Sequence, residues 1–271
     1  MTATLDPAAT GTARPRTRVT QFRVVLSEWT KFRSLRSTAF TLLAAVALMI
    51  GLGALFAAIA AGQPSGLDPG QTAVSTSLTG TFFAQLAIGV LGVLLISGEY
   101  STGMIRSSLT VVPRRLPMLW AKIAVFAGVV FVTMLIAGVV AFIVGQALLR
   151  GQQLDVALTD PGAQRAVVGA ALYVTAAGVT ALAFGALLRN TAAAITTFVA
   201  VFFVIPPLTL LLPASITEPV VRYLPTSIGS VLTGSTPGAD SLAPWTGFGV
   251  LCGYAAILIG CAAWRLRRAD A

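Results

Sequence analysis

Six long apolar runs, separated by shorter polar segments, dominate the pattern of the chain. They cover residues 39–61, 79–97, 123–149, 167–188, 192–212 and 247–264. Each run approaches the roughly 20 residues that an α-helix needs to cross the hydrocarbon core of a bilayer. A helix satisfies its own backbone hydrogen bonds in lipid, and the alternating segments typical of a membrane β-barrel do not occur. The pattern therefore predicts an all-α integral membrane protein, with a six-span transmembrane domain over residues 37–265 and a short tail at 266–271.

A segment with a different pattern precedes the first run. Residues 1–18 contain almost no large apolar side chains, and we expect them to be disordered. Residues 19–36 are amphipathic on a helical wheel, with a polar face that includes Arg23 and Lys31. The apolar face of this helix carries Phe22, Val25, Leu26, Trp29 and Phe32. Because aromatic and basic side chains suit the headgroup layer, we predict a helix along the membrane surface, rather than one packed on a soluble domain.

Composition and charge agree with a membrane protein. The chain is 56% hydrophobic and 10% charged, whereas soluble domains carry about 25% charged residues. Fifteen of its 18 Lys and Arg residues fall on the side of the membrane that holds both termini. This bias follows the positive-inside rule and predicts that both termini and residues 98–122 are cytoplasmic. The net charge of +9 is thus a topological signal, and with no nucleic-acid-binding motif we expect no nucleic-acid partner.

The chain lacks the residues that several kinds of catalytic chemistry require. The chain has no histidine, which is the commonest metal ligand and general base. Its two lysines, Lys31 and Lys122, follow Thr and Ala, so the Gly-Lys-[Ser/Thr] of a P-loop is absent. We therefore expect neither an enzyme nor a bound metal or cofactor. Cys252 and Cys261 would lie about 13 Å apart along one helix, too far for a disulfide, and we expect both in the apolar core.

The spans also bear on the source of energy for transport. Their interiors contain no Asp, Glu, Lys, Arg or His, so a proton-driven carrier would lack its usual buried relay. Sodium coupling through backbone carbonyls stays open, because such sites can use broken helices. Pro206 and Pro207 must interrupt the hydrogen-bond ladder of the fifth span. This interruption could form part of an ion site, or it could be a packing kink at the outer end of the span. The segments at 62–78 and 213–245 are typical of loops with short helical or re-entrant pieces.

The polar segment at 98–122 reads GEYSTGMIRSSLTVVPRRLPMLWAK. Residues 104–112 are amphipathic, and Pro113 ends this stretch. Arg114 and Arg115 follow beside the membrane, where anionic lipid attracts them. The segment predicts a short cytoplasmic helix that is rigidly joined to two spans, with an ordinary basic loop as the simpler alternative.

Two stretches, LSEWTKFRSLRST before the first span and GEYSTGMIRSSLTVVPRR after the second, resemble the permease subunits of type-2 ATP-binding-cassette (ABC-2) exporters. The resemblance is closest to small bacterial and actinobacterial members. Their motif before the first span, Glu-x-x-Lys and a Leu/Arg stretch, is matched by Glu28, Lys31, Arg33, Leu35 and Arg36. Their motif after the second span is matched by Gly98, Glu99, Gly103, Arg106, Leu109, Pro113 and Arg115. Met104 departs from the usual Thr, and the specific motifs occupy only these two stretches.

The resemblance implies an exporter permease in the bacterial plasma membrane, with the translocation pathway at a dimer interface. It implies two kinds of protein partner, a second permease copy or paralogue and a separate cytoplasmic ATPase, besides membrane lipid. The residues that it implies for coupling to the ATPase are Glu99, Gly103, Arg106, Leu109, Arg114 and Arg115. Those that it implies for a connecting helix before the first span are Glu28, Trp29, Lys31 and Arg33.

Within this implied machinery, Glu99 and Arg106 lie two helical turns apart, so one face can present both. We expect Glu99 to fix the segment to Lys31 or Arg33, and Arg106 to face the ATPase. An ion-coupled secondary carrier and a non-transporting membrane scaffold remain the alternatives. The apolar spans weakly favour an amphiphilic or apolar cargo.

Overall fold

A computed structural model describes residues 21–62, 71–101, 115–152, 156–234 and 241–268, and within these ranges every regular element is a helix. The elements in chain order are α1 (Gln21–Ser34), α2 (Arg36–Gly62), α3 (Gln71–Ser77), α4 (Thr81–Ser101), α6 (Arg115–Leu149), η1 (Arg150–Gln152), α7 (Pro161–Leu188), α8 (Thr191–Val199), η2 (Ala200–Val204), α9 (Ile205–Leu208), η3 (Thr209–Leu211), α10 (Ala214–Val221), α11 (Pro225–Thr233) and α12 (Pro244–Arg268). The predicted disordered segment 1–18 and the short helix predicted at 104–112 lie outside the described residues.

Six of the described helical stretches are long and apolar enough to cross a membrane. They cover Arg36–Gly62, Ala73–Gly98, Leu116–Leu149, Gly162–Leu188, Thr191–Leu208 and Pro244–Arg267. Each contains or closely overlaps one of the predicted runs, so the prediction of an all-α, six-span membrane protein is confirmed. Except in the fifth span, which ends at Leu208 rather than at residue 212, the helices are longer than the apolar runs. α6 begins at Arg115 rather than at residue 123, because polar residues can continue a helix beyond the hydrocarbon.

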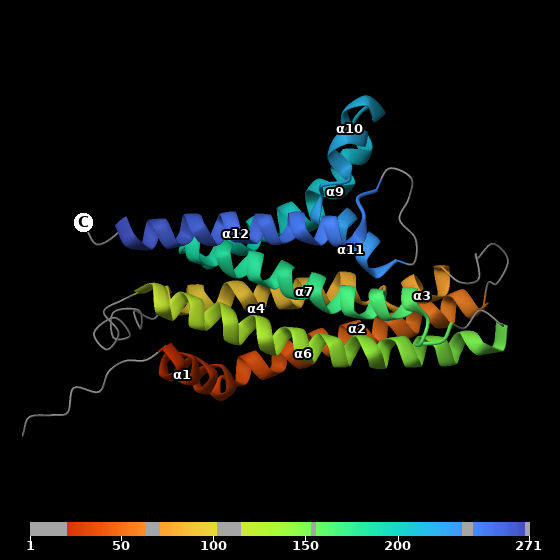
Figure 1. Cartoon of the computed structure of the whole chain (residues 1–271), viewed down its shortest axis with the longest axis horizontal. Coiled ribbons are helices and arrows are strands. Elements are labelled where there is room, and N and C mark those ends of the chain that lie inside the picture. The colour runs from red at the N-terminus through yellow and green to blue at the C-terminus, as the bar shows by residue number, and fades with distance from the viewer. Residues whose placement is uncertain (1–20, 63–70, 102–114, 153–155, 235–240, 269–271) are drawn as a thin grey trace, which may run out of the picture.

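The fourth span, α7, forms the centre of the bundle. Its most apolar stretch is 78% buried, whereas the corresponding stretches of the first, third, fifth and sixth spans are 17–33% buried. It packs against α4, α6 and α12, and α2 packs on α4 and α6 (Figure 1). The spans run side by side, and α1 lies at the same end of the bundle as the end of α12. We call this the α1 end.

Glycine allows the central spans to approach closely. A Cβ on Gly92 of α4 would lie 2.5 Å from the carbonyl oxygen of Gly178 on α7, which is closer than side-chain carbons pack. A Cβ on Gly178 would in turn lie 2.7 Å from the side chain of Ile88. Lipid offers no hydrophobic driving force between helices, so such close contact is a main source of helix association in membranes.

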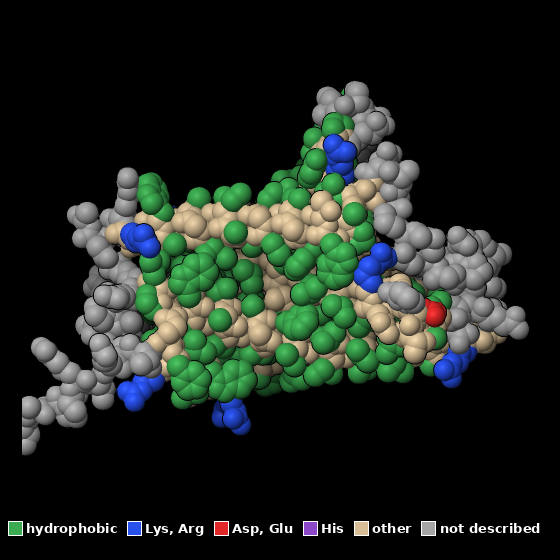
Figure 2. All heavy atoms as spheres, viewed as in Figure 1, with side chains coloured by type: hydrophobic (Ala, Val, Ile, Leu, Met, Phe, Trp, Pro, Cys, Tyr) green, Lys and Arg blue, Asp and Glu red, His purple; other side chains and the backbone are tan. Residues whose placement is uncertain are grey.

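The sides of the bundle are apolar. Figure 2 shows hydrophobic side chains along the length of the spans, with Lys and Arg gathered toward the ends of the molecule. Phe40 and Leu43 on α2, Ile136 on α6 and Ile257 on α12 are all at least 60% exposed. A soluble monomer rarely exposes apolar patches of this extent, whereas lipid is the natural solvent for them.

The fifth span is broken near the residues that the sequence predicts. It begins as α8, changes to a π-helix at Ala200–Val204, and continues into α9, which contains Pro206 and Pro207. Proline has no N–H for the helix ladder, so the chain relaxes into a wider turn before the pair. The predicted interruption is confirmed, and the segment beyond it contains two short helices, α10 and α11, as expected for its composition.

A tight turn joins the fourth and fifth spans at the α1 end. Arg189 adopts a left-handed conformation, with φ of 57°, and its N–H donates to the carbonyl oxygen of Gly185. The side chain of Asn190 then accepts a hydrogen bond from the N–H of Ala193 and caps α8. The hydroxyl of Thr191 donates to the hydroxyl of Ser97 over 2.9 Å, which fixes the start of α8 to α4.

Gln146 makes a buried polar connection near the opposite end. Its amide nitrogen lies 3.3 Å from the carbonyl oxygen of Ala73 and 3.2 Å from the hydroxyl of Ser77. Its amide oxygen accepts from the N–H of Val156 over 2.7 Å. One side chain on α6 therefore holds both α3 and the chain that leads into α7.

Replacing Gln146 by alanine should leave the N–H of Val156 without its acceptor, and the hydroxyl of Ser77 with only its bond to the carbonyl oxygen of Ala73. We expect a loss of about 1–3 kcal/mol in the free energy of unfolding, observed as a lower melting temperature of the purified chain in detergent. The matched change Gln164→Ala, at an exposed position, should have little effect. Equal melting temperatures for the two variants would contradict this role for Gln146.

One sequence-based expectation about the core was wrong. Cys252 and Cys261 are free thiols, as expected, but both are exposed on α12 rather than buried. The error has a physical reason, since a helix in lipid turns apolar residues outward as well as inward.

Candidate functional site

A buried ion pair joins α1 to α6 at the α1 end. A Glu28 oxygen and the Lys122 nitrogen lie 2.7 Å apart, and their side chains are 5% and 4% exposed. The other Glu28 oxygen lies 3.1 Å from the nitrogen of Lys31, which is one turn further along α1 and 43% exposed. A carboxylate buried this deeply needs a paired cation, so these contacts fix α1 on the bundle.

The sequence of α1 explains which face it buries. Val24, Glu28 and Phe32 recur every four residues and are all buried, so they form one stripe along the helix. α1 packs mainly against α6, and the amide of Gln21 donates to the carbonyl oxygen of Pro117 over 3.0 Å. A break at Leu35 separates α1 from α2. α1 is foreshortened in Figure 1, where the spans run across the view, so it crosses the direction of the spans.

A second stripe on α1 faces outward. Phe22 and Leu26 are 73% and 54% exposed, and Trp29 is 44% exposed. The helical wheel had placed Phe32 with these residues, but Phe32 is buried against the bundle. The helix therefore has two apolar sides, one packed on the bundle and one uncovered within the described residues.

The residues expected to form a connecting helix are all described. Glu28 is buried, Lys31 is partly exposed, and Trp29 and Arg33 are exposed. The structure describes the expected coupling residues less completely. Glu99 lies in the last turn of α4 and Arg115 is the first residue of α6, but the structure does not describe their side chains. The remaining coupling residues, Gly103, Arg106, Leu109 and Arg114, lie outside the described residues.

Sequence reasoning did not find the contact between Glu28 and Lys122. It treated Glu28 as a motif residue and Lys122 as an interface marker, and it sought a partner for Lys31 in Glu99. The structure pairs Lys31 with Glu28, and the expected contact of Glu99 stays a prediction. One signal was available, because Glu28 is the only acidic residue of α1 and recurs in step with Val24 and Phe32.

A cavity of about 510 Å³ lies beside this ion pair. It is bounded by α1, the first turns of α2, the last turns of α4 and the start of α6. Glu28, Lys31 and Lys122 form part of its wall, and Gly98, the last residue before Glu99, forms another part. The cavity thus adjoins both ends of the polar segment 98–122.

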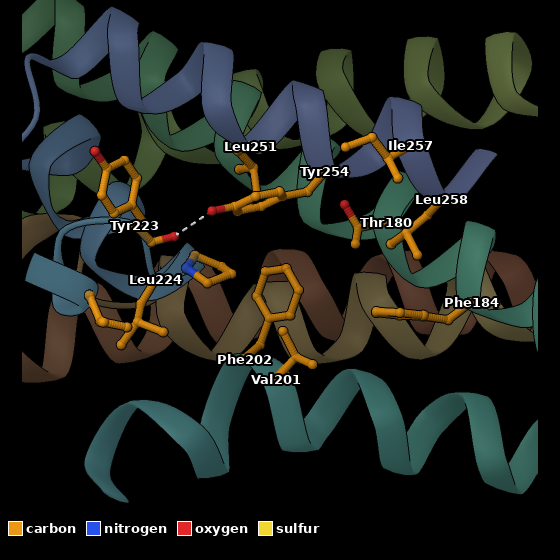
Figure 3. A pocket seen from close by; sticks show the side chains of 12 residues that line it. Thr180, Phe184, Val201, Phe202, Tyr223, Leu224, Leu251, Tyr254, Ile257 and Leu258 are labelled. Atoms are coloured by element: carbon orange, nitrogen blue, oxygen red, sulfur yellow. Dashed lines mark hydrogen bonds between the residues drawn. The ribbon is translucent and has the colours of Figure 1, made fainter. Parts of the chain in front are cut away.

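A second cavity, of about 400 Å³, lies further along the bundle (Figure 3). Phe184 of α7, Phe202 of the π-helix and Tyr254 of α12 line it, and the ring of Tyr254 is directed toward Tyr223. The hydroxyl of Tyr254 donates to the carbonyl oxygen of Tyr223 over 3.2 Å, which connects α12 to the chain between α10 and α11. The wider turn of the fifth span carries Phe202 into this cavity, and the wall is almost entirely apolar.

Within the described part of the chain, no three His, Cys, Asp or Glu residues gather as a metal site would require. A comparison with curated proteins gives no match. The family model described as "ABC-2 family transporter protein" matches residues 24–206. The matched part begins in α1, contains the Glu28–Lys122 pair and the segment 98–122, and ends at the proline pair of the fifth span. The match covers more than half of the chain, so the protein belongs to the ABC-2 transporter family, and it is a multi-pass membrane subunit of a transporter.

Proposed function

We propose that the chain is the permease of an ATP-driven exporter, with the ATPase on a separate subunit. The proposal places both termini and residues 98–122 in the cytoplasm of a bacterial cell, in keeping with the distribution of Lys and Arg. Two permease chains pair and form the translocation pathway between them. Membership of the ABC-2 family supports an ATPase partner in general.

The Glu28–Lys122 pair is the observation that carries the proposed mechanism. It fixes α1 to the first turns of α6, at the end of the segment 98–122 that we assign to contact with the ATPase. A push on residues 98–122 would therefore move α1, α4 and α6 together. The uncovered side of α1, with Phe22, Leu26 and Trp29, suits a helix that lies in the headgroup layer while its other side stays on the bundle.

Arg106→Ala and Glu99→Ala should uncouple transport from ATP hydrolysis. We expect each to lower export and transport-linked ATP hydrolysis at least tenfold in vesicles that contain the permease and its ATPase, because the segment would lose its contact or its rigid attachment. Arg150→Ala, a matched change at the opposite end of the bundle, should leave both rates unchanged. If both loop variants kept wild-type export and hydrolysis, the assigned roles would be wrong.

The fifth span, with its π-helix at Ala200–Val204, is the feature that would suit an ion-coupled carrier instead, because such carriers bind ions where their helices are irregular. The two functions differ in their need for ATP. Transport by the purified chain in liposomes without ATP would favour the carrier. A chain that moves no candidate cargo even with its ATPase present would favour a membrane scaffold.

A further inference from the structure

Gln85 places an amide side chain in the middle of the second span. It is 0% exposed, and neither its amide nitrogen nor its amide oxygen has a well-formed hydrogen bond to a described residue. Thr81 lies one turn earlier on the same face of α4, and its buried hydroxyl also lacks such a bond. Because about nine in ten buried polar groups are hydrogen-bonded, two neighbouring exceptions indicate a polar ligand beside them.

Tyr173 of α7 brings a third polar group to this place. Its side chain is buried, and its hydroxyl approaches the amide of Gln85. The ring of Tyr173 lies against α11, since a Cβ on Gly229 would be 2.4 Å from Cζ, the ring carbon that bears the hydroxyl. The polar groups therefore lie in the bundle where α7 packs on α4 and α11 packs on α7.

Tyr173 alone cannot satisfy these groups. A glutamine amide offers two N–H donors and an acceptor oxygen, whereas a tyrosine has a single hydroxyl. Even when Tyr173 bonds to Gln85, an N–H of Gln85 and the hydroxyl of Thr81 still need partners. A water molecule can both accept and donate, and a buried water typically makes about three hydrogen bonds.

A metal cation fits the same groups less well. It could bind the oxygen atoms, but it could not accept a hydrogen bond from the amide N–H groups of Gln85. The interiors of the spans contain no Asp or Glu, so a cation there would also lack a counter-charge in a region of low dielectric constant. Water brings no net charge and carries no such cost.

We propose that Gln85, Thr81 and Tyr173 bind one buried water molecule, which is a permanent part of the structure. The water accepts a hydrogen bond from the Gln85 amide and bonds to the hydroxyls of Thr81 and Tyr173. It thereby joins α4 to α7 in the middle of the bundle. This inference does not depend on the proposed export, since it is tested on the permease chain without an ATPase.

The first test removes each polar group with little change in volume, in the variants Gln85→Met, Thr81→Val and Tyr173→Phe. With a bound water, each change should lower the melting temperature of the full chain in detergent by about 2–4 °C, the shift expected for about one lost hydrogen bond. Without a ligand, the apolar side chains would relieve buried groups that have no partner, and the melting temperature would rise. Such a rise would overturn the proposal.

A control and a double variant make this test specific. Thr180 is as buried as Thr81, but its hydroxyl donates to the carbonyl oxygen of Ala176 in its own helix, so Thr180→Val should leave the melting temperature nearly unchanged. Thr81→Val and Tyr173→Phe combined should lose clearly less than the sum of the two single losses, because both act through the same water. Additive losses would contradict a shared ligand.

The last tests separate water from a cation and observe the ligand directly. The melting temperature should be the same in sodium chloride and in choline chloride at equal concentration. A stabilisation by sodium that Gln85→Met abolishes would overturn the proposal in favour of an ion site. A structure in lipid nanodiscs, at a resolution that shows ordered water, should have one density peak within hydrogen-bond distance of the Gln85 amide, and its absence would also overturn the proposal.

Discussion

Replacing Lys122 by methionine should lower the free energy of unfolding of the chain by about 3 kcal/mol. The change leaves the Glu28 carboxylate buried, with Lys31 neutralising it from a half-exposed position. Removing one partner of a buried ion pair costs about 3–5 kcal/mol, and we take the lower end because of Lys31. Equilibrium unfolding of the purified chain in mixed micelles, with increasing sodium dodecyl sulfate, would measure the loss.

Two further variants make this prediction specific. Glu28→Leu combined with Lys122→Met removes both charges and should recover most of the lost stability, because apolar residues of similar volume can replace a buried pair. Lys31→Met alone should cost less than about 1 kcal/mol, since its side chain is partly in solvent. A double variant as unstable as Lys122→Met would show that the loss has another cause.

Gly53→Ala is the second change with a large expected effect. A Cβ at this position would lie 2.4 Å from the carbonyl oxygen of Ser77, and a backbone oxygen cannot rotate away as a flexible side chain can. We expect α2 and the α3–α4 connection to be forced apart, with a loss of about 1–3 kcal/mol. The loss should be measured as a lower melting temperature in detergent.

Gly51→Ala is the matched control on the same helix. A Cβ on Gly51 would meet nothing within 4 Å, and alanine is a better helix former than glycine by about 1 kcal/mol. This variant should therefore be as stable as the wild type or more stable. If both alanine variants shifted the melting temperature equally, the close contact at Ser77 would not be limiting.

The six spans could be predicted because lipid imposes a local rule. A helix must be long and apolar enough to cross it, and that property is readable from each run by itself. The break in the fifth span was readable for the same reason, since Pro206 and Pro207 act on their own helix. What could not be predicted was the wide turn at Ala200–Val204 that accommodates them.

The candidate site was harder to predict because it depends on residues far apart in sequence. Glu28 and Lys122 meet only because α1 crosses the start of α6, and no local pattern records that crossing. The prediction of which side chains of α1 are buried was partly wrong for a related reason. A wheel separates polar from apolar residues, whereas α1 buries a carboxylate with Val24 and Phe32 and exposes Trp29. The cysteines of α12 show the same limit, since an apolar residue can face either lipid or protein.

Because α6 is long, a small tilt at one of its ends would displace the residues at its other end. Its 35 residues run without interruption from Arg115 to Leu149 and span about 52 Å. One end of the helix is held by the ion pair between Lys122 and Glu28, and Gln146 lies near the other end. A tilt of α6 by about 5° about Lys122 would displace Gln146, which lies about 36 Å further along the helix, by roughly 3 Å. The hydrogen bonds of Gln146 to Ser77 and Val156 would then be the first contacts at the distant face to break.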